Sequence, residues 1–395
     1  MKKIIFFIFI ICLLFPKVVL AKDEIDINIT PGARSAIMME ASTGEILYNK
    51  NANKPCSVAS LTKMMGLIII FETIEKGGLS LDEIITVSEN AKNMGGTQLW
   101  LDTGEKISVR DLIKGITMAS ANDAMVAMAE RVAGTEDAFV QMMNNKVKEY
   151  GLKNTNFKNV TGLDQEGHYS SCYDMAIIAR ELIKHEEVLE FTKTYEDYIR
   201  EGTTNKTWIS NTNKLVRFYK GADGLKTGYE DKAGSCIAAT AKRDNLRFIV
   251  ILLGYDKVNN RNKEAMDLLD YGFNQYKADL IYKKGSVVSK IKIDKASTEV
   301  SLITKEDIIN LRKKVDKEKN YKYLIDLKDV KLPIEKDYNI GNLLIKDKDK
   351  IIRKIPLYVK DEIKKIGFFK FYLNTIKGVL LGENWLINKC LVLLY

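Results

Sequence analysis

A serine and a lysine three positions apart, Ser60 and Lys63, are spaced so that they could do chemistry together in this 395-residue chain. On a helix this spacing places both side chains on one face. A serine hydroxyl is a weak nucleophile at neutral pH and needs a neighbouring base to accept its proton. A lysine amine can be that base where burial or a nearby cation lowers its pKa. The pair therefore predicts a nucleophile that has its own base.

The flanking sequence predicts that this pair lies on a buried helix. Pro55 precedes the pair and Gly77-Gly78 follows it, as is typical of a helix start and end. The run from Met64 to Ile70 is almost entirely apolar, which indicates burial. Ser60 near the N-terminus of such a helix would meet backbone N–H groups that favour a developing oxyanion. Taken alone the pattern is weak, because the segment Ser289-x-x-Lys292 repeats it by chance.

The residue inventory limits the alternatives for a base. The chain has only two histidines, His168 and His185, so a Ser-His-Asp triad is nearly excluded and a lysine base gains weight. The five cysteines are scattered without a Cys-x-x-Cys pair, which argues against a disulfide framework and against a zinc site. We therefore expect neither a metal nor an organic cofactor.

Composition and the N-terminus indicate an exported globular protein. The chain is 46% hydrophobic and 29% charged, and its length allows two or three domains. Lys2-Lys3, the apolar run Ile4 to Phe15 and the small-residue site ending at Ala21 predict a signal peptide over residues 1–21. The alternative is a buried N-terminal strand or helix. A net charge of +9 favours an anionic membrane surface or wall polymer as neighbour, and without a nucleic-acid motif we do not expect nucleic acid as a partner.

The elements along the chain predict a mixed α+β domain. Strands are expected over 35–39 and 45–48, and again over 236–241 and 246–253, with a turn at 221–224. Between them lies a block of helices, one of which begins at a capping box formed by Ser108-x-x-Asp111. We therefore expect an antiparallel sheet built from both ends of this segment, with helices inserted between them.

Three short motifs follow one another in a fixed order. They are Ser60-x-x-Lys63, Ser120-Ala121-Asn122 and Lys226-Thr227-Gly228, although Ser88-Glu89-Asn90 shows that Ser-x-Asn alone can arise by chance. Together with the signal peptide they resemble the penicillin-recognising serine acyl-transferase superfamily. The closer resemblance, over about residues 33–275, is to low-molecular-weight penicillin-binding proteins, the D-alanyl-D-alanine carboxypeptidases.

The resemblance implies the catalytic roles. Ser60 would attack the carbonyl of the penultimate D-alanine, Lys63 would act as general base, and Ser120 would relay protons. The backbone N–H groups of Ser60 and Tyr229 would form the oxyanion hole. A neighbouring Lys226 would lower the pKa of Lys63, and the sequence leaves open which of these two lysines is the base.

The resemblance also implies the substrate-binding roles. Asn122 would hold the backbone amide of the substrate and help to position Lys63. Lys226 and Thr227 would bind the terminal carboxylate, since a cation and a hydroxyl suit that group. Gly228, next to Tyr229, would let the peptide lie along the strand with no side chain in the way.

Three residues qualify the resemblance. His168 is expected to pack or to cap a helix and not to catalyse. Gly66 stands where the family usually has Thr or Ala, and Glu230 stands where a small polar residue is usual after the third motif. These departures leave the chemistry of the three motifs intact.

Other functions remain open at this point. A serine β-lactamase would use the same Ser60 and Lys63, and would need a further carboxylate, for which Glu166 is the nearby candidate. An endopeptidase acting on cross-links is a close variant. A non-catalytic wall- or membrane-binding protein that keeps the fold would have no need of all the motif residues.

Four regions are expected along the chain. Residues 1–21 are the signal peptide, 22–277 a serine transpeptidase-like catalytic domain, 278–360 a small β-rich domain, and 361–395 an amphipathic tail. The tail is expected to lie on an anionic membrane surface, with docking on the β-rich domain as the alternative. Stem peptides of peptidoglycan and β-lactams are the expected ligands, and the outer face of the cytoplasmic membrane or the cell wall is the expected location.

Overall fold

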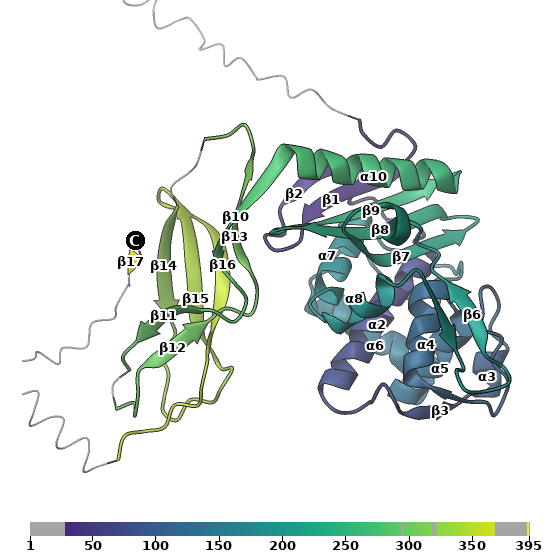
Figure 1. Ribbon diagram of the computed structural model, residues 1–395, viewed down its shortest axis with the longest axis horizontal. Helices are drawn as coiled ribbons and strands as arrows, with labels where there is room; N and C mark the ends of the chain where they lie inside the picture. The colour runs from purple at the N-terminus through teal and green to yellow at the C-terminus, as the bar shows by residue number, and fades with distance from the viewer. Residues whose placement is uncertain (1–27, 294, 318–320, 368–392, 395) are drawn as a thin grey trace, which may run out of the picture.

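A computed structural model describes residues 28–293, 295–317, 321–367 and 393–394 of the chain (Figure 1). The first part is organised around a five-stranded antiparallel sheet in the order β2-β1-β9-β8-β7. Its strands are β1 (Ser35–Glu40), β2 (Ile46–Lys50), β7 (Ala222–Glu230), β8 (Gly234–Arg243) and β9 (Leu246–Tyr255). Ile37 of β1 pairs with Ile251 of β9, which confirms a sheet built from the two ends of the segment.

The central strands are buried on both faces because helices cover both sides of the sheet. One apolar core lies between the sheet and the inserted helices, and a second lies between the sheet and α10 (Val258–Gln275). Figure 1 shows α10 lying along the face of the sheet opposite the helical block. Sheets covered on both faces have near-continuous apolar strands, as in the run from Phe248 to Leu253.

The inserted block surrounds one buried helix. From Met64 to Phe71 the helix α2 (Lys63–Glu75) is apolar and buried, as expected for a helix with neighbours on every side. The block contains η1 (Ala59–Thr62), α2 (Lys63–Glu75), α3 (Glu89–Lys92), α4 (Val109–Lys114), η2 (Gly115–Ala119), α5 (Asn122–Ala133), α6 (Glu136–Glu149), α7 (Cys172–Leu182) and α8 (Glu187–Thr192). The predicted cap at Ser108 is confirmed, because its hydroxyl accepts a hydrogen bond from the Asp111 N–H at 3.1 Å.

Small elements complete this part of the chain. They are the hairpins β3 (Ile84–Thr86) with β4 (Lys106–Ser108) and β5 (Glu196–Ile199) with β6 (Thr207–Ser210), and the short helix α9 (Leu215–Phe218). The turn predicted over 221–224 is shorter than expected, since β7 already begins at Ala222. None of the described helices is long and apolar enough to cross a bilayer.

A second, β-rich part follows α10. Its strands are β10 (Tyr276–Tyr282), β11 (Val287–Ile291), β12 (Val300–Ile303), β13 (Ile308–Lys313), β14 (Lys322–Leu327), β15 (Asn339–Asp347), β16 (Lys350–Val359) and β17 (Leu393–Leu394). The pair β10 and β13 was not foreseen from the sequence, and it forms a separate two-stranded ladder.

The start of the predicted tail belongs to this β-rich part. Ile363 and Ile334 exchange two backbone hydrogen bonds, of 2.8 and 2.9 Å, and Ile366 N donates to Lys295 O. Residues 361–366 are therefore not part of an amphipathic helix. Most of the predicted tail, residues 368–392, lies outside the described residues.

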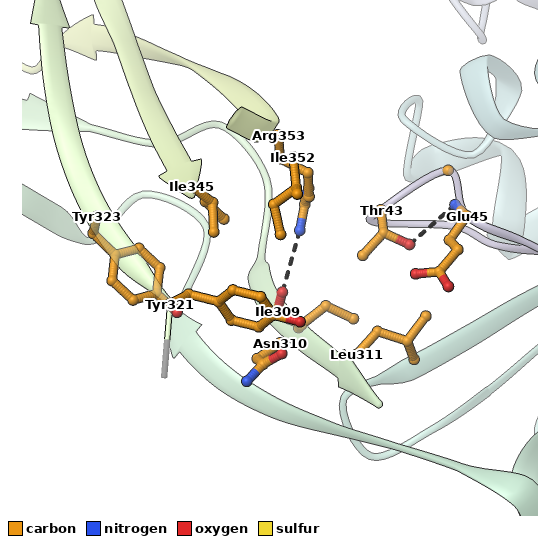
Figure 2. A pocket seen from close by; sticks show the side chains of 11 residues that line it. Thr43, Glu45, Ile309, Asn310, Leu311, Tyr321, Tyr323, Ile345, Ile352 and Arg353 are labelled. Atoms are coloured by element: carbon orange, nitrogen blue, oxygen red, sulfur yellow. Dashed lines mark hydrogen bonds between the residues drawn. The ribbon is translucent and has the colours of Figure 1, made fainter. Parts of the chain in front are cut away.

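A cavity of about 290 Å³ lies between the two parts (Figure 2). The turn at residues 43–45 lines one side, and Tyr323 and Arg353 are among the residues that line the other. The Arg353 guanidinium donates to Ile309 O and to Ser42 O, both at 3.2 Å. One side chain of the β-rich part thereby holds the turn between β1 and β2.

Candidate active site

Ser60 lies in the short turn of 3-10 helix, η1, that leads into α2. It therefore lies close to the N-terminus of the buried helix, as predicted, in the turn that precedes α2. Its neighbour Ala59 has a φ of +49°, a conformation that is uncommon for a residue with a side chain. Such backbone outliers cluster at functional sites, where the surrounding structure holds them.

The Lys63 amine lies in hydrogen-bond contact with the Ser60 hydroxyl. Its Nζ donates to Ser60 Oγ at 2.8 Å, to Asn122 Oδ1 at 2.7 Å and to Thr161 O at 2.8 Å. The three N–H groups of the ammonium form therefore each have an acceptor, which fixes the Lys63 nitrogen in one position. The spacing of the first motif thus does bring nucleophile and base together.

Burial lowers the pKa of Lys63 to about 7, because the side chain is fully excluded from water. The negative charges of Glu230 and Asp123 oppose this effect and raise the pKa. Burial, one of the two causes expected from the sequence, is therefore the main one, and Lys226 is not among the charges that affect the pKa of Lys63. A pKa near 7 leaves a substantial share of Lys63 as the neutral amine, the form that can accept a proton.

The second motif lies where η2 meets α5. Ser120 has a φ of +66° and is nearly buried, and its hydroxyl makes no hydrogen bond with any other described residue. The Asn122 side chain joins two parts of the site, since its Oδ1 accepts from Lys63 while its Nδ2 donates to Gly95 O at 2.6 Å. One hydrogen of Nδ2 remains for a ligand.

The third motif lies on the edge strand β7, directly beside Ser60. A β-carbon added to Gly228 would lie 2.9 Å from Ser60 N and 3.0 Å from Ala59 Cβ. Only a glycine lets the strand approach the turn this closely. The next residue, Tyr229, is 62% exposed. The close approach places the backbone after Gly228 beside the Ser60 N–H, where the predicted oxyanion hole would be.

Lys226 and Thr227 form the inner part of the same strand. The Lys226 side chain is fully buried, and its Nζ donates to Thr227 O at 2.8 Å. Burial first, and then repulsion by Lys63, hold the pKa of Lys226 well below its usual value. The Thr227 hydroxyl donates to Thr212 Oγ1 at 2.8 Å. The structure therefore brings the third motif to the first two across a separation of more than a hundred residues.

Two neighbouring residues that the sequence analysis missed complete the lysine's surroundings. The Thr161 carbonyl accepts from Lys63, and Gly162 follows it with a φ of +87°. A β-carbon on Gly162 would lie 2.0 Å from Ala59 O, so no side chain fits there. The role of a backbone carbonyl cannot be recognised from residue types. Gly162 was the one sequence signal that could have indicated a close backbone approach at this position.

Two residues singled out from the sequence lie outside this hydrogen-bond network. His168 packs inside the domain, with its Nε2 2.8 Å from Thr62 Oγ1 and its Nδ1 accepting from Lys158 N. Burial lowers its pKa to about 4, so it is neutral and structural, as predicted. Glu166, the carboxylate that a β-lactamase would need, is exposed, and no hydrogen bond joins it to Ser60 or Lys63 among the described residues.

Comparisons with known proteins agree with this geometry. Residues 22–257 match the family described as D-alanyl-D-alanine carboxypeptidase, and residues 276–365 match the C-terminal domain of penicillin-binding protein 5. The D-alanyl-D-alanine carboxypeptidase DacF of Bacillus subtilis is 44% identical over 346 residues, which cover 87% of this chain and 89% of that protein. The DacA enzyme of Escherichia coli is 32% identical over 365 residues, covering 89% of this chain and 88% of that protein.

Solved structures show the same fold. Penicillin-binding protein 5 of Haemophilus influenzae superposes with a TM-score of 0.66 at 29% identity, over 85% of this chain and 98% of that one. Penicillin-binding protein D2 of Listeria monocytogenes, in its ampicillin-bound form, matches 61% of this chain with a TM-score of 0.56 and 33% identity, over 98% of that chain. The chain therefore belongs to the D-alanyl-D-alanine carboxypeptidase family, the low-molecular-weight penicillin-binding proteins, and is a serine-type peptidase.

Proposed function

We propose that this carboxypeptidase removes the terminal D-alanine of peptidoglycan pentapeptides through an acyl-enzyme on Ser60. The observation that carries the proposal is the 2.8 Å contact between Lys63 Nζ and Ser60 Oγ, with a lysine pKa near 7. The neutral Lys63 amine takes the hydroxyl proton as Ser60 Oγ attacks the penultimate carbonyl carbon. The carbonyl oxygen becomes an oxyanion, which the N–H groups of Ser60 and Tyr229 stabilise.

The tetrahedral intermediate then expels D-alanine. The peptide C–N bond breaks, and the leaving amine receives a proton from Lys63 by way of the Ser120 hydroxyl. This hydroxyl is available because it makes no hydrogen bond with any other described residue. Water attacks the resulting Ser60 ester, again with Lys63 as base, and releases the shortened peptide. The enzyme returns to its starting state with no external cofactor.

The third motif selects the substrate end. The buried Lys226 ammonium and the Thr227 hydroxyl suit a free terminal carboxylate. Binding an anion would restore the charged form of Lys226, whose pKa burial holds low. Asn122 contributes its remaining N–H to a substrate carbonyl, and Gly228 leaves room for the extended peptide.

Labelling with a penicillin followed by peptide mapping tests the proposal. We expect the acyl group on Ser60, and we expect Ser60→Ala to abolish both the labelling and D-alanine release from diacetyl-lysyl-D-alanyl-D-alanine. If the Ser60→Ala protein were still labelled, Ser60 would not be the acylated nucleophile. Amidation of the terminal carboxylate should suppress turnover, and rapid penicillin hydrolysis without peptidase activity would favour a β-lactamase.

We further propose that the enzyme works outside the cell and on a membrane surface. Residues 1–21 have the pattern of an export signal, and the sequence of residues 368–395 alternates lysines with aromatic and aliphatic residues. A net charge of +9 suits an anionic surface. The tail would hold the enzyme beside its wall substrate at the outer face of the cytoplasmic membrane.

A further inference from the structure

The loop at residues 95–101 lies between α3 and β4 and contacts the second motif. It contains no helix or strand. Among the described residues, one backbone-to-backbone hydrogen bond joins it to another segment, from Asn122 N to Thr97 O at 2.7 Å. The position of loop 95–101 therefore depends on the side chains that reach its N–H and carbonyl groups.

The loop sets the orientation of the Asn122 side chain. The Gly95 carbonyl accepts a hydrogen bond from Asn122 Nδ2 at 2.6 Å, which turns Asn122 Oδ1 toward Lys63 Nζ, 2.7 Å away. The approach is close, since a β-carbon on Gly96 would lie 2.7 Å from Asn122 Nδ2. If the loop moved away, the amide would be free to rotate, and the Lys63 ammonium would lose one of its three acceptors.

A single buried carboxylate holds the loop in this position. Asp123 is 1% exposed and accepts hydrogen bonds from Leu99 N at 2.9 Å, from Leu101 N at 3.2 Å and, within α5, from Ala124 N at 2.8 Å. The two leucines are buried, whereas Trp100 between them is 79% exposed and has a φ of +57°. Such a backbone conformation persists only where the surroundings fix it. The loop is thus held by the residue that directly follows Asn122.

The guanidinium of Arg200, which follows β5, holds the same loop. It donates to Leu99 O at 3.3 Å and to Trp100 O at 3.4 Å, and it forms an ion pair with Glu105. Leu99 therefore has its N–H bound to Asp123 and its carbonyl bound to Arg200. Two charged side chains from different elements converge on one peptide segment, which is more than an exposed loop needs for its own sake.

We propose that Asp123 is a positioning residue for acyl transfer, which acts through loop 95–101 on Asn122 and thereby on Lys63. Among the described residues its carboxylate makes no hydrogen bond to Asn122 or Lys63, so the effect passes along the backbone from Leu99 to Gly95. The proposal depends on the proposed function for the reaction that Lys63 serves.

The charge of Asp123 provides a second measurable effect. The charges that act on the pKa of Lys63 are those of Glu230 and Asp123, and both raise it, while the neighbouring cation Lys226 is itself affected by Lys63. Removal of the Asp123 charge therefore lowers the pKa of Lys63, and the neutral amine persists to lower pH. A change that only displaces the loop leaves this charge in place.

The first experiment measures two variants of the full-length mature protein over a range of pH. Asp123→Asn keeps the shape and replaces one acceptor oxygen by an NH2 group, so one loop N–H loses its acceptor. We expect acylation by penicillin and D-alanine release from diacetyl-lysyl-D-alanyl-D-alanine to fall by up to about a hundredfold at the plateau of the pH profile. The acidic limb of kcat/KM should lie at lower pH than in the parent protein.

Arg200→Lys disturbs the loop without that charge effect. It keeps the positive charge beside Glu105 and loses the planar fork that reaches two carbonyls. Because Arg200 is not among the charges that act on Lys63, we expect a lower plateau and an unmoved acidic limb. This variant tests the loop even if Asp123→Asn does not fold. A plateau equal to that of the parent protein in Arg200→Lys, or in a folded Asp123→Asn, would overturn the proposal.

Asp174→Asn is the matched control. Asp174 is 2% exposed and holds another loop in the same manner, since it accepts from Asn154 N at 2.7 Å and from the Thr155 hydroxyl at 2.8 Å. It is not among the charges that act on Lys63. We expect a lower melting temperature with plateau and acidic limb unchanged. If Asp174→Asn and Asp123→Asn changed the rate and the pH profile equally, Asp123 would be a general stabilising residue and the proposal would be wrong.

A double-mutant cycle tests the route through Asn122. The Asn122→Ala protein lacks the amide that the loop orients, so adding Asp123→Asn should leave its plateau rate of acylation by penicillin unchanged. Multiplied losses would show that Asp123 acts through another group. If the parent protein were neither acylated nor able to release D-alanine, the proposed function would fail. The hold on the loop would then be judged by hydrogen exchange, which Asp123→Asn should accelerate at the Leu99 and Leu101 amides, and unchanged exchange would contradict it.

Discussion

Gly228 and Ser60 face each other across the gap between β7 and η1 so closely that no side chain fits between them. A β-carbon on Gly228 would lie 2.9 Å from the Ser60 nitrogen, a separation that real β-carbons essentially never show. The catalytic serine and the substrate-binding strand are therefore in direct backbone contact. The geometry of the proposed oxyanion hole depends on this contact.

Gly228→Ala should move β7 away from Ser60 and misplace one oxyanion donor. Loss of such a donor costs about a hundredfold or more in kcat, and we expect a loss of that order with the fold retained. Gly367→Ala, where nothing lies within 4 Å of the added carbon, is the matched control. Wild-type acylation by penicillin in Gly228→Ala would refute the role given to this contact.

The reaction rate should rise with pH through about 7. Lys63 must be neutral to act as base, and its pKa lies near that value. Glu230 raises this pKa, since a negative charge favours the ammonium form. Glu230→Gln should therefore shift the acidic limb of the kcat/KM profile to lower pH and increase the activity below pH 7.

The control for this shift is Asp231→Asn. Asp231 neighbours Glu230 in the chain and is not among the charges that affect Lys63. We expect its profile to superpose on that of the parent protein. An unmoved acidic limb in Glu230→Gln would show that Lys63 is not the group that titrates.

Lys226→Met should stabilise the protein while it impairs turnover. The folded-state pKa of Lys226 lies well below its ordinary value of 10.5. Below pH 10.5 the native protein therefore either keeps Lys226 neutral, while the unfolded chain binds a proton, or carries a buried charge, and both lower the free energy of unfolding. This loss of stability is greatest at low pH and disappears above pH 10.5. We expect a melting temperature several degrees higher at pH 7, and a smaller gain at pH 10.

Lys263→Met serves as the comparison for Lys226→Met. Lys263 is exposed, and its pKa is raised by Asp267, so its removal offers no such gain. If the Lys226→Met protein were less stable than its parent at pH 7, burial of Lys226 would not destabilise the protein as inferred. Loss of D-alanine release with retained stability would be expected from its proposed role in carboxylate binding.

Truncation after Gly367 should release an active enzyme from anionic vesicles. The cut leaves the pairing of Ile363 with Ile334 intact and removes β17, the two-residue strand that pairs with β14. Salt should detach the full-length protein only partly, because burial of apolar side chains is not screened. Equal partitioning of both proteins would mean that the tail is not an anchor.

Much of the site could be predicted from the sequence because its signals are local. Ser60 and Lys63 lie within one helical turn, where spacing alone places two side chains together. The Ser108 cap needs only a neighbouring backbone N–H. The strands at the two ends of the catalytic segment are predicted by their apolar runs. A recognisable order of three motifs then supplied the family.

Tertiary structure alone decided the features that depend on distant contacts. The low pKa of Lys63 comes from burial by the whole domain, and the Thr161 carbonyl that holds it carries no side-chain signature. Trp100 faces water because Asp123 fixes the amides on either side of it. The ladder of β10 with β13 joins strands whose short runs are interspersed with charges. Such contacts form only when folding brings remote segments together, so spacing along the chain cannot reveal them.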